Sequence, residues 1–507
     1  MKMKFVIVFA VLLLAAVFAR PGKKKPHIIF LLADNSGWSD VEWNDPIGVM
    51  KTPNLKKLAS TGVILNQTYA QPICTPTRAA LMTGYYPFRS GLGHAMIMPS
   101  QPSYLSREFK VLPEHLKELG YTNHLVGKWH LGACRWDVTP LWRGFDSHYG
   151  PHHGYIEYYT QSISVEDQES ELLGQDPGAT ALDFHDNTGA MFHHQGTHAS
   201  ELTGKRAVDI ISRHNSDTPM FLWMTFLLPH FPFMVPDRYR DLYSPVPVDG
   251  LQEYRGMVSM LDETVGNITN ALIANDMYEN SVIVYLSDNG GPWFFGTQWP
   301  LRGGMATPFE GGVRSPGMVH SPLLEKTGYV NNELIHVVDF FPTFLSLAGG
   351  TPDPKLDGKN VWNTISTGAP SPRTDMLLHF DTHPVSPCTA IRYGDYKLIH
   401  GRYDVMRNVT DIVDQTPTDT WFPPPELSDA DIPDVHAPKD GTQLFDLSVD
   451  PLEINNLADE MPDKVAELLA LADVITAGAP DPFYPDLMPD IADPNAWYNG
   501  TWTPGWC

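Results

Sequence analysis

The sequence is poor in cysteine and in basic side chains. It has four cysteines in 507 residues, and its 35 Lys and Arg stand against 59 Asp and Glu. Four cysteines are too few for a fold built on disulfides. The formal net charge of −24 argues against a nucleic-acid-binding protein, which needs a basic face. Beyond the first 20 residues, no apolar run is long enough to cross a membrane.

The N-terminus has the pattern of a signal peptide. Lys2 and Lys4 precede a continuous apolar run over 5–18, and we expect signal peptidase cleavage at Ala19. The run is short for the alternative, an uncleaved membrane anchor. We therefore expect residues 1–19 to be removed, and the protein to enter the secretory pathway without an anchor and to be secreted or lysosomal. Four glycosylation sequons agree with this route, at Asn66, Asn267, Asn408 and Asn499.

Four continuous apolar runs end in polar side chains that can bind ions or react. Runs without alternation are typical of strands buried on both faces of a parallel sheet. Ligands bind beyond the carboxyl ends of such strands, so the four endings together predict one shared site. Taken singly, each ending is also compatible with a loop cap. The runs are 27–33 before Asp34 and Asn35, 281–287 before Asp288 and Asn289, 220–226 before His230, and 123–126 before Lys128 and His130.

Helical patterns separate these runs and predict an α/β fold. We expect helices near 52–59, 112–120 and 253–275, where apolar residues recur at helical spacing. After about residue 375 the pattern indicates a hairpin around Gly394, a strand at 443–447 and a helix at 461–476. The prediction is thus a large mixed, mostly parallel sheet flanked by helices in 20–375. A smaller antiparallel sheet with one helix, a Pro-rich loop and a tail is predicted for 376–507.

Cys74 begins the strongest local motif, which reads CTPTRAALMTG. Pro76 suits the first turn of a helix, which places Cys74 at the positive end of that helix, and Arg78 adds a fixed positive charge. Such a place suits an anion such as sulfate or phosphate, and it also lowers the pKa of a thiol. A reactive cysteine and a structural cysteine in a disulfide are both compatible with this pattern.

The motif Cys74-x-Pro76-x-Arg78, followed by 81–84, resembles the signature of the sulfatase family, which belongs to the alkaline phosphatase-like superfamily. The segments 71–74 and 299–303 resemble the arylsulfatase B, or N-acetylgalactosamine-4-sulfatase, branch. The resemblance implies an alkaline phosphatase-like fold and a sulfuric ester hydrolase that cleaves a sulfated sugar or an aryl sulfate. Matching motifs follow in family order within residues 26–475, at 127–132, 143–146, 229–232, 288–291, 310–314, 444–447 and 450–458.

The resemblance also implies the chemistry of the site. Cys74 is expected to become Cα-formylglycine through the formylglycine-generating enzyme, and its hydrated diol attacks sulfur. One divalent ion, Ca²⁺, takes oxygen ligands. The implied catalytic residues are Cys74, Arg78, Lys128, His130 and His230; the implied metal ligands are Asp34, Asn35, the modified Cys74, Asp288 and Asn289; and the implied substrate-binding residues are Lys128, His230 and Arg302.

Two positions depart from the family pattern. Asn35 stands where a second Asp is usual, which removes one negative charge from the metal site. Met305 stands where the family has a lysine that grips sulfate, and losing one such contact commonly costs about 10²–10³ in rate. Because the two changes have opposite sign, we hypothesise that they are coupled.

The two departures leave an alternative open, a catalytically impaired, secreted relative that binds anionic glycans. A phosphatase of the same superfamily is disfavoured, because those enzymes have Thr or Ser at the position of Cys74. The acidity of the chain disfavours a long polysulfated substrate, since a polyanion gains from a basic approach surface.

A few features lie outside the motifs. The histidine pairs 152–153 and 193–194 are candidate metal ligands, but such pairs are more often solvated loop residues. For the tryptophans of the tail (497, 502 and 506), packing against the main domain is favoured over a sugar-binding platform. With Cys74 modified, the sequence allows at most one disulfide among Cys134, Cys388 and Cys507, and its pairing stays open.

Overall fold

The computed structural model describes residues 24–163, 180–246, 248–403, 420–427, 432–433, 440–497 and 500–507. The predicted signal peptide, the sequons at Asn408 and Asn499 and most of the Pro-rich loop lie outside these residues. None of the described helices has the length and apolarity needed to cross a membrane.

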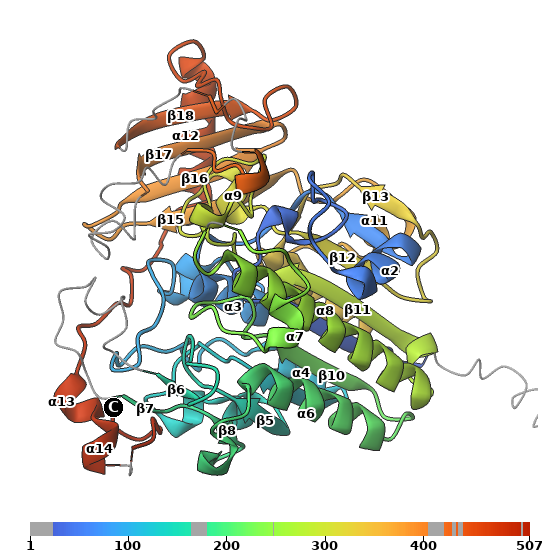
Figure 1. Ribbon diagram of the computed structural model, residues 1–507. Helices are drawn as coiled ribbons and strands as arrows, with labels where there is room; N and C mark the ends of the chain where they lie inside the picture. The colour runs from blue at the N-terminus through green and yellow to red at the C-terminus, as the bar shows by residue number, and fades with distance from the viewer. Residues whose placement is uncertain are drawn as a thin grey trace, which may run out of the picture.

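A ten-stranded sheet forms the centre of the molecule (Figure 1). The four apolar runs are adjacent strands in the order β11 (Ser281–Ser287), β1 (His27–Ala33), β10 (Met220–Thr225) and β4 (Thr122–Gly127), all parallel. This confirms the predicted mixed, mostly parallel sheet. The remaining strands extend it on both sides: β5 (Ser147–Gly150), β8 (His185–Asp186) and β9 (Gly189–Ala190) beyond β4, and β12 (Gly317–His320), β2 (Val63–Leu65) and β13 (Tyr329–Asn331) beyond β11.

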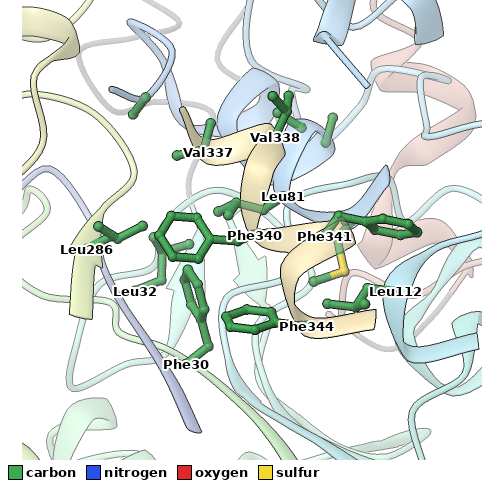
Figure 2. Packing of buried hydrophobic residues seen from close by; sticks show 14 of the residues in the cluster. Phe30, Leu32, Leu81, Leu112, Leu286, Val337, Val338, Phe340, Phe341 and Phe344 are labelled. Atoms are coloured by element: carbon green, nitrogen blue, oxygen red, sulfur yellow. The ribbon is translucent and has the colours of Figure 1, made fainter. Parts of the chain in front are cut away.

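Helices cover both faces of this sheet, which explains the unbroken apolar sequence of its strands. Ile29 and Leu31 of β1 pack on the side of α2 (Pro53–Thr61), α6 (Ala199–Arg213) and α8 (Leu251–Ala274). Phe30 and Leu32 pack on the opposite side, with α3 (Cys74–Thr83), α4 (Leu112–Glu118) and α10 (Phe340–Leu347). Figure 2 shows Phe30 among Leu32, Phe340 and Phe344 of this second layer. Both faces of β1 are therefore core, as in other parallel sheets.

A second, four-stranded antiparallel sheet follows in the chain. It consists of β15 (Asp375–Asp381), β16 (Cys388–Tyr393), β17 (Tyr396–Arg402) and β18 (Asp440–Asp446). The turn between β16 and β17 places Gly394 at φ +56°, a conformation that suits glycine, as the predicted hairpin requires. Helix α12 (Pro462–Thr476) contacts β16, with Leu468 fully buried.

The tail leaves this sheet and returns to the ten-stranded sheet, where α13 (Pro489–Ala492) and α14 (Pro494–Trp497) lie near β6 (Ser162–Ile163) and β7 (Ala181–Leu182) (Figure 1). Trp502 is buried with Ile163 and Ala181, and Trp506 packs against the same cluster, as expected. The side chain of Trp497 lies outside the described part of the chain. Cys507 forms a disulfide with Cys134, and Cys388 is a free, buried thiol. The smaller elements are β3 (Thr68–Tyr69), β14 (Ile335–His336), β6 (Ser162–Ile163), β7 (Ala181–Leu182), α7 (Asp237–Arg240), α9 (Glu310–Val313) and α11 (Trp362–Thr367).

Candidate active site

Polar side chains from the ends of the central strands are buried together at one edge of the sheet. Asp34 directly follows β1, Asp288 follows β11 and Lys128 follows β4, and all three are inaccessible to solvent. Lys128 Nζ lies 2.8 Å from Asp34 Oδ2. Because β11, β1, β10 and β4 are parallel neighbours, their carboxyl ends meet at one place, as the sequence predicts.

Cys74 is the first residue of α3, so it sits where the unpaired main-chain amides of that helix point. Its Sγ lies 3.3 Å from Nδ1 of His130. The Nε2 of His130 lies 2.9 Å from the carbonyl oxygen of Ile97, which needs a proton on Nε2. His130 thus presents an unprotonated Nδ1 to position 74. Its backbone has a left-handed φ of +57°, a strain typical of functional positions.

The thiol of Cys74 is not activated by this setting, which corrects the expectation of a lowered pKa. Burial raises the pKa of the Cys74 thiol to about 11, and the nearby carboxylates of Asp34 and Asp288 act in the same direction. Lys128 and Arg78 oppose this shift without cancelling it. The side chain is only 5% exposed, so the loss of hydration outweighs the helix end and the cations. An unmodified Cys74 is therefore a neutral thiol.

Two buried ion pairs frame Cys74. Arg78 donates to Asp288 Oδ2 through Nη2 at 2.8 Å and through Nε at 3.1 Å. Lys128 forms the second pair with Asp34, and the Nη1 of Arg78 donates to the main-chain carbonyl of Lys128 at 3.1 Å. The carboxylates of Asp34 and Asp288 neutralise the charges of Lys128 and Arg78, so these four side chains together have no net charge.

The oxygen atoms at the ends of β1 and β11 fit a hard divalent cation. The carboxylates of Asp34 and Asp288 and the amide groups of Asn35 and Asn289 are all buried there. Asn289 donates from Nδ2 to Asn35 Oδ1 at 2.7 Å. Its own Oδ1 is buried and has no hydrogen-bond partner among the described residues. A buried carbonyl oxygen without a partner is costly, and a cation such as Ca²⁺ would satisfy it.

His230 is half-buried and lies close enough to Lys128, Asp288 and Arg78 for their charges to act on it. Its ring stacks on Tyr155, with the ring centroids 5.6 Å apart, and its Nδ1 lies 2.6 Å from the carbonyl oxygen of Phe231. Burial, with the charge of Lys128 adding to it, lowers the pKa of His230 to about 3. The imidazole is therefore neutral at ordinary pH, and its Nε2 carries the lone pair.

The two departures from the family pattern lie at this site. Met305 packs against the apolar cluster of Ile73, Cys74 and Ala306, which contains the reacting position. Asn35 adopts a left-handed φ of +64°, which asparagine tolerates better than most residues. Both substituted residues thus lie at the site, and the coupling between them stays a prediction.

Arg302 is placed differently from the prediction. Its guanidinium lies over the rings of Phe309 and Trp421, 4.3 and 4.8 Å from their centroids. Its Nη1 donates to the main-chain carbonyl of Glu453 at 2.8 Å. The side chain is 1% exposed and directed to the contact with the second sheet, so we do not retain it as a substrate ligand.

Other candidates separate clearly. The interpretation of His152 and His153 as solvated is wrong, since they are 3% and 5% exposed, whereas His193 is exposed as expected. Sequence reasoning did not find Tyr155 or the Ile97 carbonyl, which position His230 and His130. Neither has a signal in the sequence, because aromatic residues in loops are common and every residue has a main-chain carbonyl.

Comparisons with known proteins agree with this geometry. Residues 26–350 match the model of the sulfatase family, and residues 307–419 match that of the C-terminal region of N-sulphoglucosamine sulphohydrolase. Mouse arylsulfatase J is 37% identical over 461 residues, and the alignment covers 88% of this chain and 75% of arylsulfatase J. Human N-acetylgalactosamine-6-sulfatase is 30% identical over 370 residues, covering 68% of this chain and 66% of its own.

Solved structures share the fold. The crystal structure of Ps i-CgsB superimposes with a TM-score of 0.75 at 24% identity, covering 94% of this chain and 99% of its own. The phosphonate monoester hydrolase of Agrobacterium radiobacter superimposes with a TM-score of 0.58 at 18% identity, covering 89% of this chain and 95% of its own. The family model covers more than half of the chain, and the signature residues gather in one buried site. This chain therefore belongs to the sulfatase family, whose members are sulfuric ester hydrolases.

Proposed function

We propose that this protein is an arylsulfatase-type enzyme that hydrolyses small sulfate esters at the Cys74 site. The observation that carries the proposal is the placement of Cys74 at the start of α3, 3.3 Å from His130 and framed by Arg78 and Lys128. A sulfate ester is an anion, and only a buried pocket with fixed cations and main-chain amides can hold it in an acidic protein.

Two groups complete the proposed site. Asp34, Asn35, Asp288 and Asn289 would hold one Ca²⁺, and Cys74 would be converted to formylglycine by the formylglycine-generating enzyme during secretion. When present, they supply polarisation of the sulfate group and an oxygen nucleophile in place of the thiol. Without this conversion the site would have a poor nucleophile, because burial raises the pKa of the Cys74 thiol and a neutral thiol attacks slowly.

The side chains of this chain then have separable tasks. Lys128 and Arg78 bind and orient the sulfate oxygens, since both are buried and fixed by their carboxylate partners. His130 accepts a proton at Nδ1, because its Nε2 donates to Ile97. The same residue is neutral, since burial and the charges of Lys128 and Arg78 hold its pKa well below 6.5. His230 can deliver a proton to the departing alcohol only after its Nε2 has taken one up, because the imidazole is otherwise neutral.

For the substrate we propose a sulfated sugar of short length or an aryl sulfate. The relatives are named for aryl sulfates and for N-acetylgalactosamine 6-sulfate, and one related structure was solved with D-glucosamine-2-N,6-O-disulfate. The arylsulfatase B-like segments at 71–74 and 299–303 favour a galactosamine sulfate within this class. The net charge of −24 disfavours a long polyanion.

We also propose that the protein follows the secretory route to the cell exterior or the lysosome. Asn267 is exposed on α8 and is available for glycosylation. Asn66 is half-buried, and its Nδ2 donates to Asn332 at 2.7 Å, so it is the poorer acceptor of the two described sequons.

Turnover of a chromogenic aryl sulfate by the secreted protein, with Ca²⁺ present, tests the proposal. We expect hydrolysis by the wild type and none above background by Cys74→Ala, with both proteins equally folded by circular dichroism. Mass spectrometry of the peptide that contains residue 74 should show the aldehyde or its hydrate. An unmodified thiol together with no turnover would contradict the proposal.

A further inference from the structure

A second cluster of buried ligating side chains lies on the β5–β8 side of the sheet. It consists of His152, in the loop after β5, with Asp183 and His185, just before and in β8. Each of the three offers one ligating atom, and these atoms lie within 4.8 Å of one another. The side chains are 3%, 0% and 1% exposed, so a bound ion would be shielded from solvent.

Asp183 is already held in the orientation that a ligand needs. Its Oδ2 accepts from the main-chain N–H of His153 at 2.8 Å and lies 2.9 Å from the Nδ1 of the same residue. Its Oδ1 accepts from the main-chain N–H of His152 at 3.1 Å and lies 3.1 Å from His185 Nε2. Hydrogen bonds of this kind, which fix a ligating carboxylate, are usual around metal sites.

One pair of ligating atoms has a separation close to that expected around a tetrahedral ion. Two ligands with bonds of about 2.0–2.2 Å to one tetrahedral centre lie roughly 3.3 Å apart. The separation of His185 Nε2 and Asp183 Oδ1, 3.1 Å, is close to this edge.

His152 supplies the independent sign that a ligand is expected. Its Nδ1 is buried and has no hydrogen-bond partner among the described residues. Its ring stacks between those of His185 and His148, with centroids 4.4 and 4.9 Å away. Three imidazoles packed together at this depth leave polar nitrogens that are costly without a partner. His148 is the nearest candidate for a fourth ligand.

We propose that His152, Asp183 and His185 bind one zinc ion, distinct from the cation of the Cys74 site. Two imidazoles and one carboxylate favour a late first-row ion, whereas Ca²⁺ prefers oxygen ligands alone. A ligating imidazole is neutral, so zinc binding through Nε2 of His185 needs the tautomer that carries its proton on Nδ1.

The zinc site would stabilise the segment on which His130 rests. The main-chain N–H of His130 donates to the carbonyl of His152 at 2.9 Å. A Cβ on Gly154 would lie only 2.7 Å from the imidazole of His130, so residues 152–154 form the wall behind that ring. The ion would therefore be a structural support bound to His152, the first residue of this wall, without contact with substrate.

Metal analysis of the intact secreted protein tests the proposal without any activity assay. After dialysis against metal-free buffer, mass spectrometry for elements should find about one zinc per chain. Protein stripped with a chelator and titrated with Co²⁺ alone should develop the visible absorption of a tetrahedral site. The double variant His152→Ala, His185→Ala should lose both signals, and His193→Ala, an exposed histidine, should keep them.

The controls separate this site from the other. Asn289→Leu removes an oxygen ligand of the Cys74 site and should leave the zinc content unchanged. A wild type that holds no zinc and shows no Co²⁺ absorption overturns the proposal, even if the double variant does not fold. Zinc that persists in a folded double variant overturns the assignment of its ligands.

Discussion

Two lysines of this protein are completely buried in ion pairs, and they have different roles. Lys128 lies 2.8 Å from Asp34 at the end of β4, beside Cys74. Lys397, on β17, lies 2.9 Å from Glu310 and 2.8 Å from Glu453. Both are 0% exposed, so burial and charge alone do not distinguish them.

The surroundings of the two lysines make the difference. In the Lys397 cluster, Glu310 also accepts from the hydroxyl of Tyr69 at 2.8 Å, and Glu453 accepts from the main-chain N–H of Glu310 at 2.7 Å. The cluster joins α9 to β17 of the second sheet. The Lys128 cluster instead lies where the parallel strands β1, β11 and β4 end, beside Cys74. Backbone strain does not separate the two clusters, since Glu453 has a φ of +59° and Asn35 a φ of +64°. Position at the carboxyl ends of the parallel strands, rather than buried charge or strain, therefore distinguishes the site that we expect to bind a ligand.

The strongest test of this comparison is Lys397→Met. It leaves two buried carboxylates without their shared cation, and breaking a buried pair costs about 3–5 kcal/mol. We expect a large fall in the unfolding midpoint in urea, with little change in KM for any protein that stays folded. Lys464→Met, which removes an exposed ion pair with Glu467, is the matched control and should leave the midpoint nearly unchanged. A midpoint equal to that of the wild type would show that the Lys397 cluster is not structural.

Lys128→Met should give the opposite pattern. Removing one fixed cation from the site that stabilises developing charge costs about 10²–10³ in kcat/KM. Asp34 keeps a second cation, since Arg78 Nη2 lies 3.8 Å away, so we expect the stability to fall less than in Lys397→Met. Steady-state kinetics and urea unfolding on the same preparations check both parts. A purely structural effect would lower stability and leave kcat/KM of the folded fraction intact.

The third test asks whether Asn35 and Met305 are coupled. In Asn35→Asp with Met305→Lys, the added charges cancel, and we expect kcat/KM for an aryl sulfate to rise by about tenfold or more. Each single variant adds an unbalanced charge to a buried site and should gain much less. A double-mutant cycle measures the difference. A full gain from Met305→Lys alone, with Asn35 unchanged, would contradict the coupling.

The fourth test is a pH dependence that arises from His230. Burial and the charge of Lys128 lower its pKa to about 3, so above that pH the imidazole is neutral and its Nε2 carries the lone pair. Binding an anion there, and protonating the leaving alcohol, both need the protonated form. We therefore expect kcat/KM to fall as pH rises between 5 and 7, by at most about tenfold per unit. His230→Asn should flatten the profile, and an unchanged slope in that variant would assign the pH dependence to another group.

Much of the fold was predictable because its physical causes are local. An unbroken apolar run such as 281–287 has to be buried on both faces, so its place inside a parallel sheet follows from the sequence. The residues after such runs then meet at one edge, which is why Asp34, Asp288 and Lys128 could be grouped before any coordinates. The turn at Gly394 and the helix start at Cys74 likewise depend on only a few neighbouring residues.

The parts that were missed depend on residues distant in the chain. His152 and His185 are 33 positions apart in the sequence, and nothing near either one indicates that their rings stack. Arg302 stands next to matching family motifs, yet Phe309, Trp421 and Glu453 draw its side chain to the second sheet. The position of a residue near a motif in the sequence does not determine which residues its long side chain contacts.

The sequence by itself determined the kind of chemistry in this protein: which residue types follow each strand, which cysteine begins a helix, and which two charges are exchanged. Only the tertiary structure decided how those groups behave. It raised the pKa of Cys74 where its helix position alone would lower it, paired Cys134 with Cys507 and left Cys388 reduced. The reason is that pKa values and pairings depend on hydration and on distances across the fold, and both are fixed only when the chain closes around the site.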